Sequence, residues 1–273
     1  MTADSNIPTE NSRQCRMAMQ LSPRTLDVTI TPMDADTGLR QISIPLNPSE
    51  ESLKAVEDAI YATSEILADY GRVDLLMRTD AYTLVPAGVS RDVAEDCARI
   101  TMLTHDVDCP VVTIDRHDTA DVVWCAPANI MNFLARTFRN APVQCHISPL
   151  ISYFAQRSGM SNGCRLYAHF AGDKVDLIGF NAKGNLRAAV THTVDTDTDA
   201  LYFIMAVAQQ IGLDVVNDEI LLGGDASRRL SVMPLLSRYA AKVLPVIFPS
   251  AVLRSGHEAF KAPFPLIILP LCE

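Results

Sequence analysis

The stretch from Arg165 to Val194, "RLYAHFAGDKVDLIGFNAKGNLRAAVTHTV", contains three consecutive strand patterns. Turns that contain Gly172 and Gly184 separate these patterns. Strand patterns joined by short glycine-containing turns are typical of antiparallel pairing between neighbours along the chain. The stretch therefore predicts an antiparallel meander, and the fold class follows from this meander and the elements that come after it.

The residues after the meander predict two further helices that alternate with strands. The segment "DTDTDALYFIMAVAQQIG" (195–212) is rich in apolar residues and starts with acidic ones, which favour the positive end of a helix dipole. The next patterns predict a strand at "EILLGG" (219–224), a helix at "SRRLSVMPLLSRYA" (227–240) and a strand at "KVLPVIF" (242–248). The resulting order, β-β-β-α-β-α-β, is that of an RNase H-like unit.

The first half of the chain predicts a similar but looser arrangement. The alternating segment "TLDVTITPM" (25–33) and the segment "LRQISIPL" (39–46) predict a hairpin. A long amphipathic helix is predicted over 48–71, and strands and helices alternate from there to Ser158. Residues 1–22 are polar at their start and contain no continuous apolar region of a signal peptide, so we expect a flexible leader there.

Two RNase H-like units in one chain predict the actin-like ATPase fold, an α/β architecture of mixed sheets flanked by helices. We expect the leader over 1–22, the first half over 23–160 and the second half over 161–273. The duplication is inferred from the order of the elements, because no repeat is visible between the two halves of the sequence.

Composition narrows the class of protein. The chain has 273 residues, of which 48% are hydrophobic, and a formal net charge of −9, which gives no electrostatic footprint for nucleic acid. The most apolar stretches (242–253 and 263–273) are shorter than the roughly 20 residues of a membrane span, so we expect no membrane span. Seven cysteines without a Cys-x-x-Cys pair predict reduced thiols and a cytoplasmic location.

The stretch from Arg165 to Asp225 resembles a small uncharacterised bacterial family, a domain of unknown function, that has an actin-like ATPase fold. The pieces that carry the resemblance are "DLIGFN", "GNLRAAVTHTV" and "DALYFIM", and the final "LPLCE" is also similar to that family. The resemblance implies a fold with two halves and a cleft between them. It implies no established activity.

The same resemblance implies where a nucleotide would bind. In actin-like ATPases two hairpin turns wrap the phosphates, and a strand-Gly-Gly-x-Ser/Ala-helix turn faces the adenosine. This chain has a turn that matches the third element. Its glycines allow a ligand to approach the backbone closely, and the start of the following helix offers free N–H groups. The implied ligand is ATP with Mg, and the matching residues are Gly223, Gly224, Ala226 and Ser227 for adenosine, Asp36 and Gly38 for the first hairpin, and Gly172 for the second.

Both predicted phosphate turns depart from the family pattern. Leu39 stands where a small hydroxyl residue is expected, and His169 stands where an acidic, metal-orienting residue is expected. Phosphoryl transfer needs a preorganised cradle and a metal site. We therefore expect that the protein acts by binding, either weakly to a nucleotide or to a protein partner, and not by catalysis. We assign no catalytic residue. The alternatives are an active ATPase or small-molecule kinase, and a scaffold similar to actin-like pilus-assembly proteins.

Each pattern also has a plain structural interpretation. The Gly223–Gly224 turn can be a strand-to-helix connection capped by Asp225 or Ser227, with Arg228 and Arg229 either at a phosphate or in solvent. The alternating aspartates at 195, 197 and 199 favour a helix start over a calcium loop, which requires glycine and glutamate at positions occupied by alanines.

The cysteine and histidine pairs are also expected to be structural. Cys145 and His146 are predicted to be neighbours on a strand, where adjacent side chains point to opposite faces, and the same spacing argument applies to Cys164 and His169. The final apolar segment "FPLIILPLC" (264–272) is predicted to pack in the core.

Overall fold

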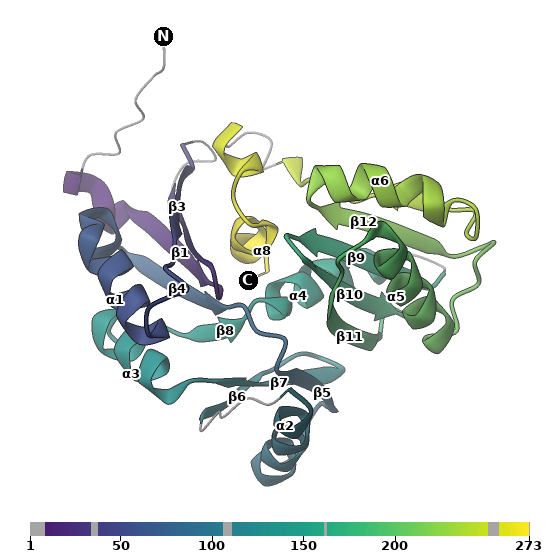
Figure 1. The fold of residues 1–273 in the computed structure, drawn as a ribbon, viewed down its shortest axis with the longest axis horizontal. Coiled ribbons are helices and arrows are strands. Elements are labelled where there is room, and N and C mark those ends of the chain that lie inside the picture. The colour runs from purple at the N-terminus through teal and green to yellow at the C-terminus, as the bar shows by residue number, and fades with distance from the viewer. Residues whose placement is uncertain (1–8, 34–37, 106–110, 161–162, 251–256, 273) are drawn as a thin grey trace.

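The computed structural model describes residues 9–33, 38–105, 111–160, 163–250 and 257–272. Two five-stranded sheets dominate the fold (Figure 1). The first sheet has the order β3-β2-β1-β4-β8, and the second has the order β11-β10-β9-β12-β13. The first sheet consists of β1 (Cys15–Leu21), β2 (Thr25–Pro32), β3 (Arg40–Pro45), β4 (Arg72–Met77) and β8 (Val143–Cys145). The second consists of β9 (Arg165–Ala171), β10 (Lys174–Phe180), β11 (Leu186–Thr193), β12 (Glu219–Gly224) and β13 (Val243–Pro245).

The two sheets have the same internal plan. In each, three consecutive strands form an antiparallel meander, and the fourth and fifth strands add in parallel on the side of the first. The predicted meander from Arg165 to Val194 is thus confirmed as β9, β10 and β11. The shared order also confirms that two RNase H-like units make up the chain.

The strand β1 corrects the prediction of a leader over residues 1–22. All seven residues from Cys15 to Leu21 are buried, and β1 lies at the centre of its sheet between β2 and β4. The sequence pattern does not indicate this strand, because the polar residues Arg16 and Gln20 interrupt its apolar pattern although both are buried. Residues 9–21 therefore belong to the folded unit, while residues 1–8 lie outside the described part of the chain.

The helices cover the two sheets from outside and also lie between them. Figure 1 shows α1 and α3 on the outer side of the first sheet, α5 and α6 on the outer side of the second, and α4 and α8 in the middle. Their bounds are α1 (Ser52–Ala62), α3 (Ala128–Thr137), α4 (Ile147–Ser158), α5 (Asp197–Gln210), α6 (Ala226–Leu236) and α8 (Phe264–Ile268). Short 3-10 turns lie at η1 (Thr9–Gln14), η2 (Ser64–Leu67), η3 (His257–Phe260) and η4 (Leu269–Leu271). In the described residues, no helix is long and apolar enough to span a bilayer.

The helix α5 begins as its acidic residues predict. Thr196 is the N-cap and accepts a hydrogen bond from the Asp199 N–H at 3.1 Å, while the Asp199 carboxylate accepts one from the Thr196 N–H at 2.9 Å. This reciprocal pair is a capping box, which satisfies two backbone N–H groups of the first turn. The aspartates at 195–199 thus stand at a helix start, as the sequence predicts.

An insertion distinguishes the first half from the second. Between β4 and α3 the chain forms β5 (Tyr82–Pro86), α2 (Arg91–His105), β6 (Val111–Asp115) and β7 (Ala120–Ala126). The three strands pair in an antiparallel sheet of order β5-β7-β6, and α2 packs on it around a small core of its own. The sequence predicts each of these elements, but nothing in it shows that they leave the main sheet.

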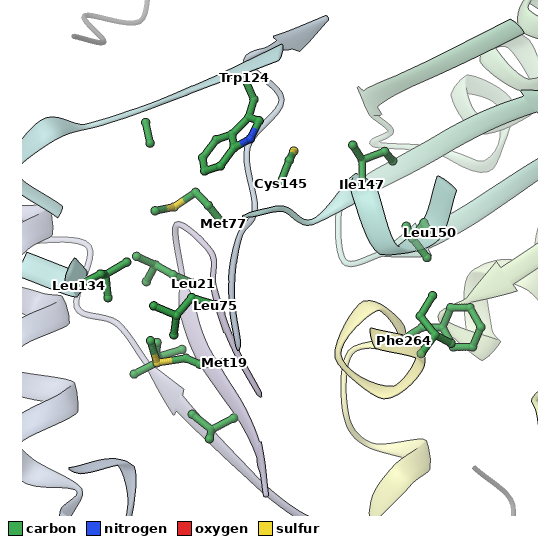
Figure 2. Packing of buried hydrophobic residues seen from close by; sticks show 14 of the residues in the cluster. Met19, Leu21, Leu75, Met77, Trp124, Leu134, Cys145, Ile147, Leu150 and Phe264 are labelled. Carbon is green, nitrogen blue, oxygen red and sulfur yellow. The ribbon is translucent and has the colours of Figure 1, made fainter. Parts of the chain in front are cut away.

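The two halves share one large apolar core. It contains side chains of β1, β4, α1 and α3 from the first half together with Tyr167, Ile178 and Phe180 from the second. Phe154 of α4 stacks on Tyr167 with ring centroids 4.0 Å apart. Figure 2 shows part of this core, in which Met19 and Leu75 lie on one side and Phe264 of α8 lies on the other. Because apolar burial is the main stabilising term in folding, the halves are held together as one unit.

Met19→Asp tests the placement of β1. Met19 is 1% exposed in the shared core, so the substitution leaves a carboxylate without water or a cationic partner. We expect the free energy of unfolding, measured by urea denaturation, to fall by at least about 4 kcal/mol. The control is Met33→Asp, at a side chain that is 54% exposed. Similar stability of the two variants would contradict a central β1.

Candidate functional site

The structure brings two of the predicted nucleotide-binding turns to one edge of the second sheet. Gly223 and Gly224 end β12, which runs parallel to β9 and pairs Gly224 with Phe170. Gly172 lies in the turn between β9 and β10, two residues beyond Phe170. The Asp225 N–H donates to the Phe170 carbonyl oxygen at 2.9 Å, which ties the two turns together.

The predicted first phosphate hairpin is in a different place. Gly38 lies in the connection between β2 and β3, with φ +97°, and Asp36 lies outside the described residues. By strand order, however, the counterpart of the β9–β10 turn is the β1–β2 turn at residues 22–24. The predicted hairpin is the β2–β3 connection because the prediction starts the fold at β2, and contact of Asp36 and Gly38 with a phosphate stays a prediction. The two equivalent turns approach each other, with 3.8 Å between Arg24 Nη2 and Asp173 Oδ2.

The fold itself requires a glycine in the turn that follows β12. Gly224 has φ +78°, and a Cβ placed there would be 1.9 Å from the Phe170 carbonyl oxygen. Asp225 is the N-cap of α6, and its carboxylate accepts hydrogen bonds from the N–H and the hydroxyl of Ser227 at 2.9 Å each. Ala226 is the first residue of α6. These contacts match the structural interpretation, and contact of the four residues with a nucleotide stays a prediction.

The two arginines after the turn are engaged within the protein. Arg228 contacts Asp197 at 3.2 Å and donates to the Val194 carbonyl oxygen at 3.1 Å. Arg229 donates through Nε to the Gly224 carbonyl oxygen at 3.1 Å. Both arginines therefore stabilise the starts of α5 and α6. The sequence suggests instead that they contact a phosphate or lie in solvent.

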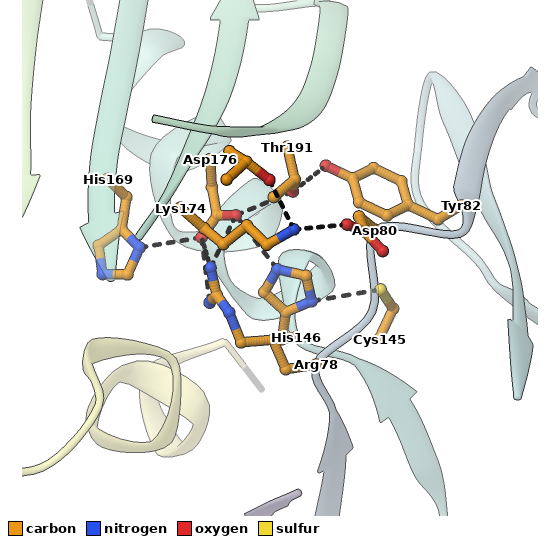
Figure 3. A network of polar contacts seen from close by, with 10 residues as sticks. Arg78, Asp80, Tyr82, Cys145, His146, His169, Lys174, Asp176 and Thr191 are labelled. Carbon is orange, nitrogen blue, oxygen red and sulfur yellow. Dashed lines mark hydrogen bonds and ion pairs between the residues drawn. The ribbon is translucent and has the colours of Figure 1, made fainter. Parts of the chain in front are cut away.

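A buried ionic cluster joins the two halves close to these turns. Asp176 of β10 is fully buried, and Figure 3 shows it at the centre of the cluster. The Arg78 guanidinium reaches both carboxylate oxygens at 3.2 and 3.3 Å, and Thr191 donates its hydroxyl at 2.9 Å. His146 and His169 contact the same carboxylate at 3.3 and 3.1 Å.

The members of the cluster come from elements far apart in the sequence. His169 and Asp176 are paired across β9 and β10, so their side chains lie on the same face of the second sheet. Arg78 directly follows β4, and His146 is the N-cap of α4. A second layer surrounds them: Tyr82 and Thr191 share a hydrogen bond at 2.8 Å, and Lys174 contacts Asp80 at 2.7 Å. Charges of the first half are therefore compensated by charges of the second.

The environment determines the protonation of the cluster. Burial alone would raise the pKa of Asp176, but Arg78 and then His146 outweigh it and hold that pKa well below its ordinary value. Burial lowers the pKa of His146 although Asp176 opposes this, and burial raises the pKa of the Cys145 thiol well above its usual range. A neutral His146 that donates from Nε2 to Asp176 and accepts at Nδ1 from the Cys145 thiol, 3.7 Å away, fits these shifts.

This contact corrects the argument that Cys145 and His146 point apart. The prediction placed both on one strand, but β8 ends at Cys145 and His146 has helical backbone angles. The change from strand to helix lets the two side chains meet. Their role is still structural, because both are buried and His146 is directed at Asp176.

The cluster has the properties of an internal connection. Its carboxylate is surrounded by donors and has no access to solvent, so it is not positioned to receive a substrate proton. Across the described ranges, no group of three or more His, Cys, Asp or Glu side chains is arranged to hold a metal ion. Sequence reasoning missed Arg78 and Asp176, and the available signal was a charged residue within or just after an apolar strand, as in "KVDLIGF" and "LLMR".

The C-terminal segment covers the cluster from one side. The ring of Phe264 in α8 lies 5.9 Å from that of His169, and the same phenylalanine packs on Tyr153 and Phe154 of α4. Leu266 and Leu269 pack against Ala18 of β1 and Leu76 of β4. The predicted packing of this segment in the core is thus confirmed, and it lies between the two sheets (Figure 1).

Two RNase H-like units with matching sheets and facing hairpin turns define a protein of the actin-like ATPase fold. A protein with actin-like ATPase fold and unknown function from Bacteroides thetaiotaomicron VPI-5482 has 18% sequence identity and a TM-score of 0.82, over 98% of this chain and 99% of that one. The chain belongs to the family described as protein of unknown function (DUF3822), whose model matches residues 4–243.

A more distant similarity is to a chain of the PilM–PilN type IV pilus biogenesis complex. The TM-score is 0.51 with 12% identity, over 95% of this chain and 98% of that one. No curated protein matches the sequence at a significant level. The similarities in structure establish the fold.

Gly224→Ala tests whether the glycine turn is required for folding. We expect a loss of at least about 3 kcal/mol in the free energy of unfolding, because the added Cβ meets backbone at 1.9 Å in a left-handed conformation. Gly172→Ala is the matched control, since Gly172 has φ +62° with no atom within 4 Å of the added Cβ. It should lose about 1–2 kcal/mol in the same urea denaturation. Equal losses would contradict the close contact at Gly224.

Asp176→Asn tests the buried cluster. Removing the charge leaves Arg78 without its carboxylate, so we expect the free energy of unfolding at neutral pH to fall by about 3–5 kcal/mol. Because the folded-state pKa of Asp176 is depressed, its contribution is present above the unfolded value of 3.8 and is lost as the pH falls below it. Wild type and variant should therefore converge in stability on acidification, measured by urea denaturation across the pH range.

The control for this variant is Asp173→Asn, which removes an exposed carboxylate that forms an ion pair between the halves. The Arg24–Asp173 pair is long at 3.8 Å and its side chains are 82% and 49% exposed. Its loss should change stability by less than about 1 kcal/mol. A small effect of Asp176→Asn, comparable to this control, would show that the buried cluster does not hold the halves together.

Proposed function

We propose that this actin-like protein acts by binding a protein partner and is not a phosphotransferase. The observation that carries the proposal is the state of His169. It stands where the family pattern requires an acidic residue to orient the metal, and its Nδ1 is committed to Asp176 at 3.1 Å. Mg²⁺ in nucleotide sites prefers oxygen ligands, so an imidazole bound in this way is a poor substitute.

The surroundings of His169 support the same proposal. The nearby carboxylate, Asp176, is neutralised by Arg78, and Phe264 covers the imidazole ring from the α8 side. A nucleotide whose phosphates and metal approached His169 would have to displace this aromatic ring and compete with Arg78 for the carboxylate. Both steps expose groups that are well satisfied in the folded chain.

The choice of a protein partner rests on the fold class and on the absence of electrostatic support for nucleic acid. A distant structural relative is part of a complex of two proteins, the PilM–PilN complex. The net charge of −9 disfavours a phosphate backbone as partner. A scaffold built on an actin-like fold agrees with both observations.

A second function, that of an active ATPase or small-molecule kinase, is favoured by one feature. The turns at Gly172 and Gly224 lie side by side, and the equivalent β1–β2 turn reaches them through Arg24 and Asp173. This is the arrangement in which an actin-like enzyme would hold a nucleotide. The two functions differ in what ATP does to the stability of the protein.

ATP with Mg²⁺ should leave the melting temperature of the protein unchanged. A ligand at 100 times its Kd adds about 2.7 kcal/mol, which corresponds to about 5–10 °C for a chain of this size. The measurement is a thermal shift with ATP, ADP and GTP, each with Mg²⁺, together with an assay of phosphate release.

A shift of that size would contradict the proposal, and phosphate release that disappears in Gly172→Val would establish the enzyme instead. In a native extract, the protein should elute in a complex larger than its mass of 29.8 kDa, while the purified chain does not. Elution of both as monomer would contradict a stable protein partner.

A further inference from the structure

We draw no further inference here: the strongest candidate, the pocket between the first sheet, α4 and the C-terminal segment, assigns no ligand because the three arginines that line it are engaged with carboxylates of the protein and the direction of the contact between His117 and Ser152 is not fixed.

Discussion

The carboxylate of Asp176 imposes the strongest constraint on this structure. A charge that is removed from water costs several kcal/mol unless the protein surrounds it with compensating groups. Here the compensation comes from Arg78 and His146 of the first half and from His169 and Thr191 of the second. The two halves must therefore adopt one relative position for the cluster to be satisfied, whereas apolar contacts such as Phe154 on Tyr167 tolerate small displacements.

The second half could be predicted well because its signals are local. The meander depends on turns of a few residues, and the start of α5 depends on Thr196 and Asp199, which are three residues apart. The first half is harder to predict from the sequence. β1 is a central strand whose buried Arg16 and Gln20 resemble surface residues until their neighbours are known, and the prediction therefore began the fold at β2.

The candidate site could be predicted only in part, because only some of its residues lie in local sequence patterns. Gly172 and Gly224 are recognised by local patterns, and the structure does bring their turns together. Arg78 and Asp176 are separated by 98 residues, so no short motif can indicate that they meet. Because the prediction does not include β1, its first hairpin is the β2–β3 connection near Gly38 and not the β1–β2 turn at residues 22–24, whereas the turns at Gly172 and Gly224 do not depend on β1.

The position of α4 restricts rotation of one half of the protein relative to the other. Actin-like folds are built from two lobes, and a hinge between lobes is a common route to conformational change. In this chain α4 contributes buried residues to the core shared by both lobes, and its N-cap belongs to the ionic cluster. Rotation of one lobe would break aromatic stacking and separate opposite charges at once. Under the proposed function, a protein partner would therefore meet a preformed surface, and its affinity would depend on complementarity without a cost for closing the lobes.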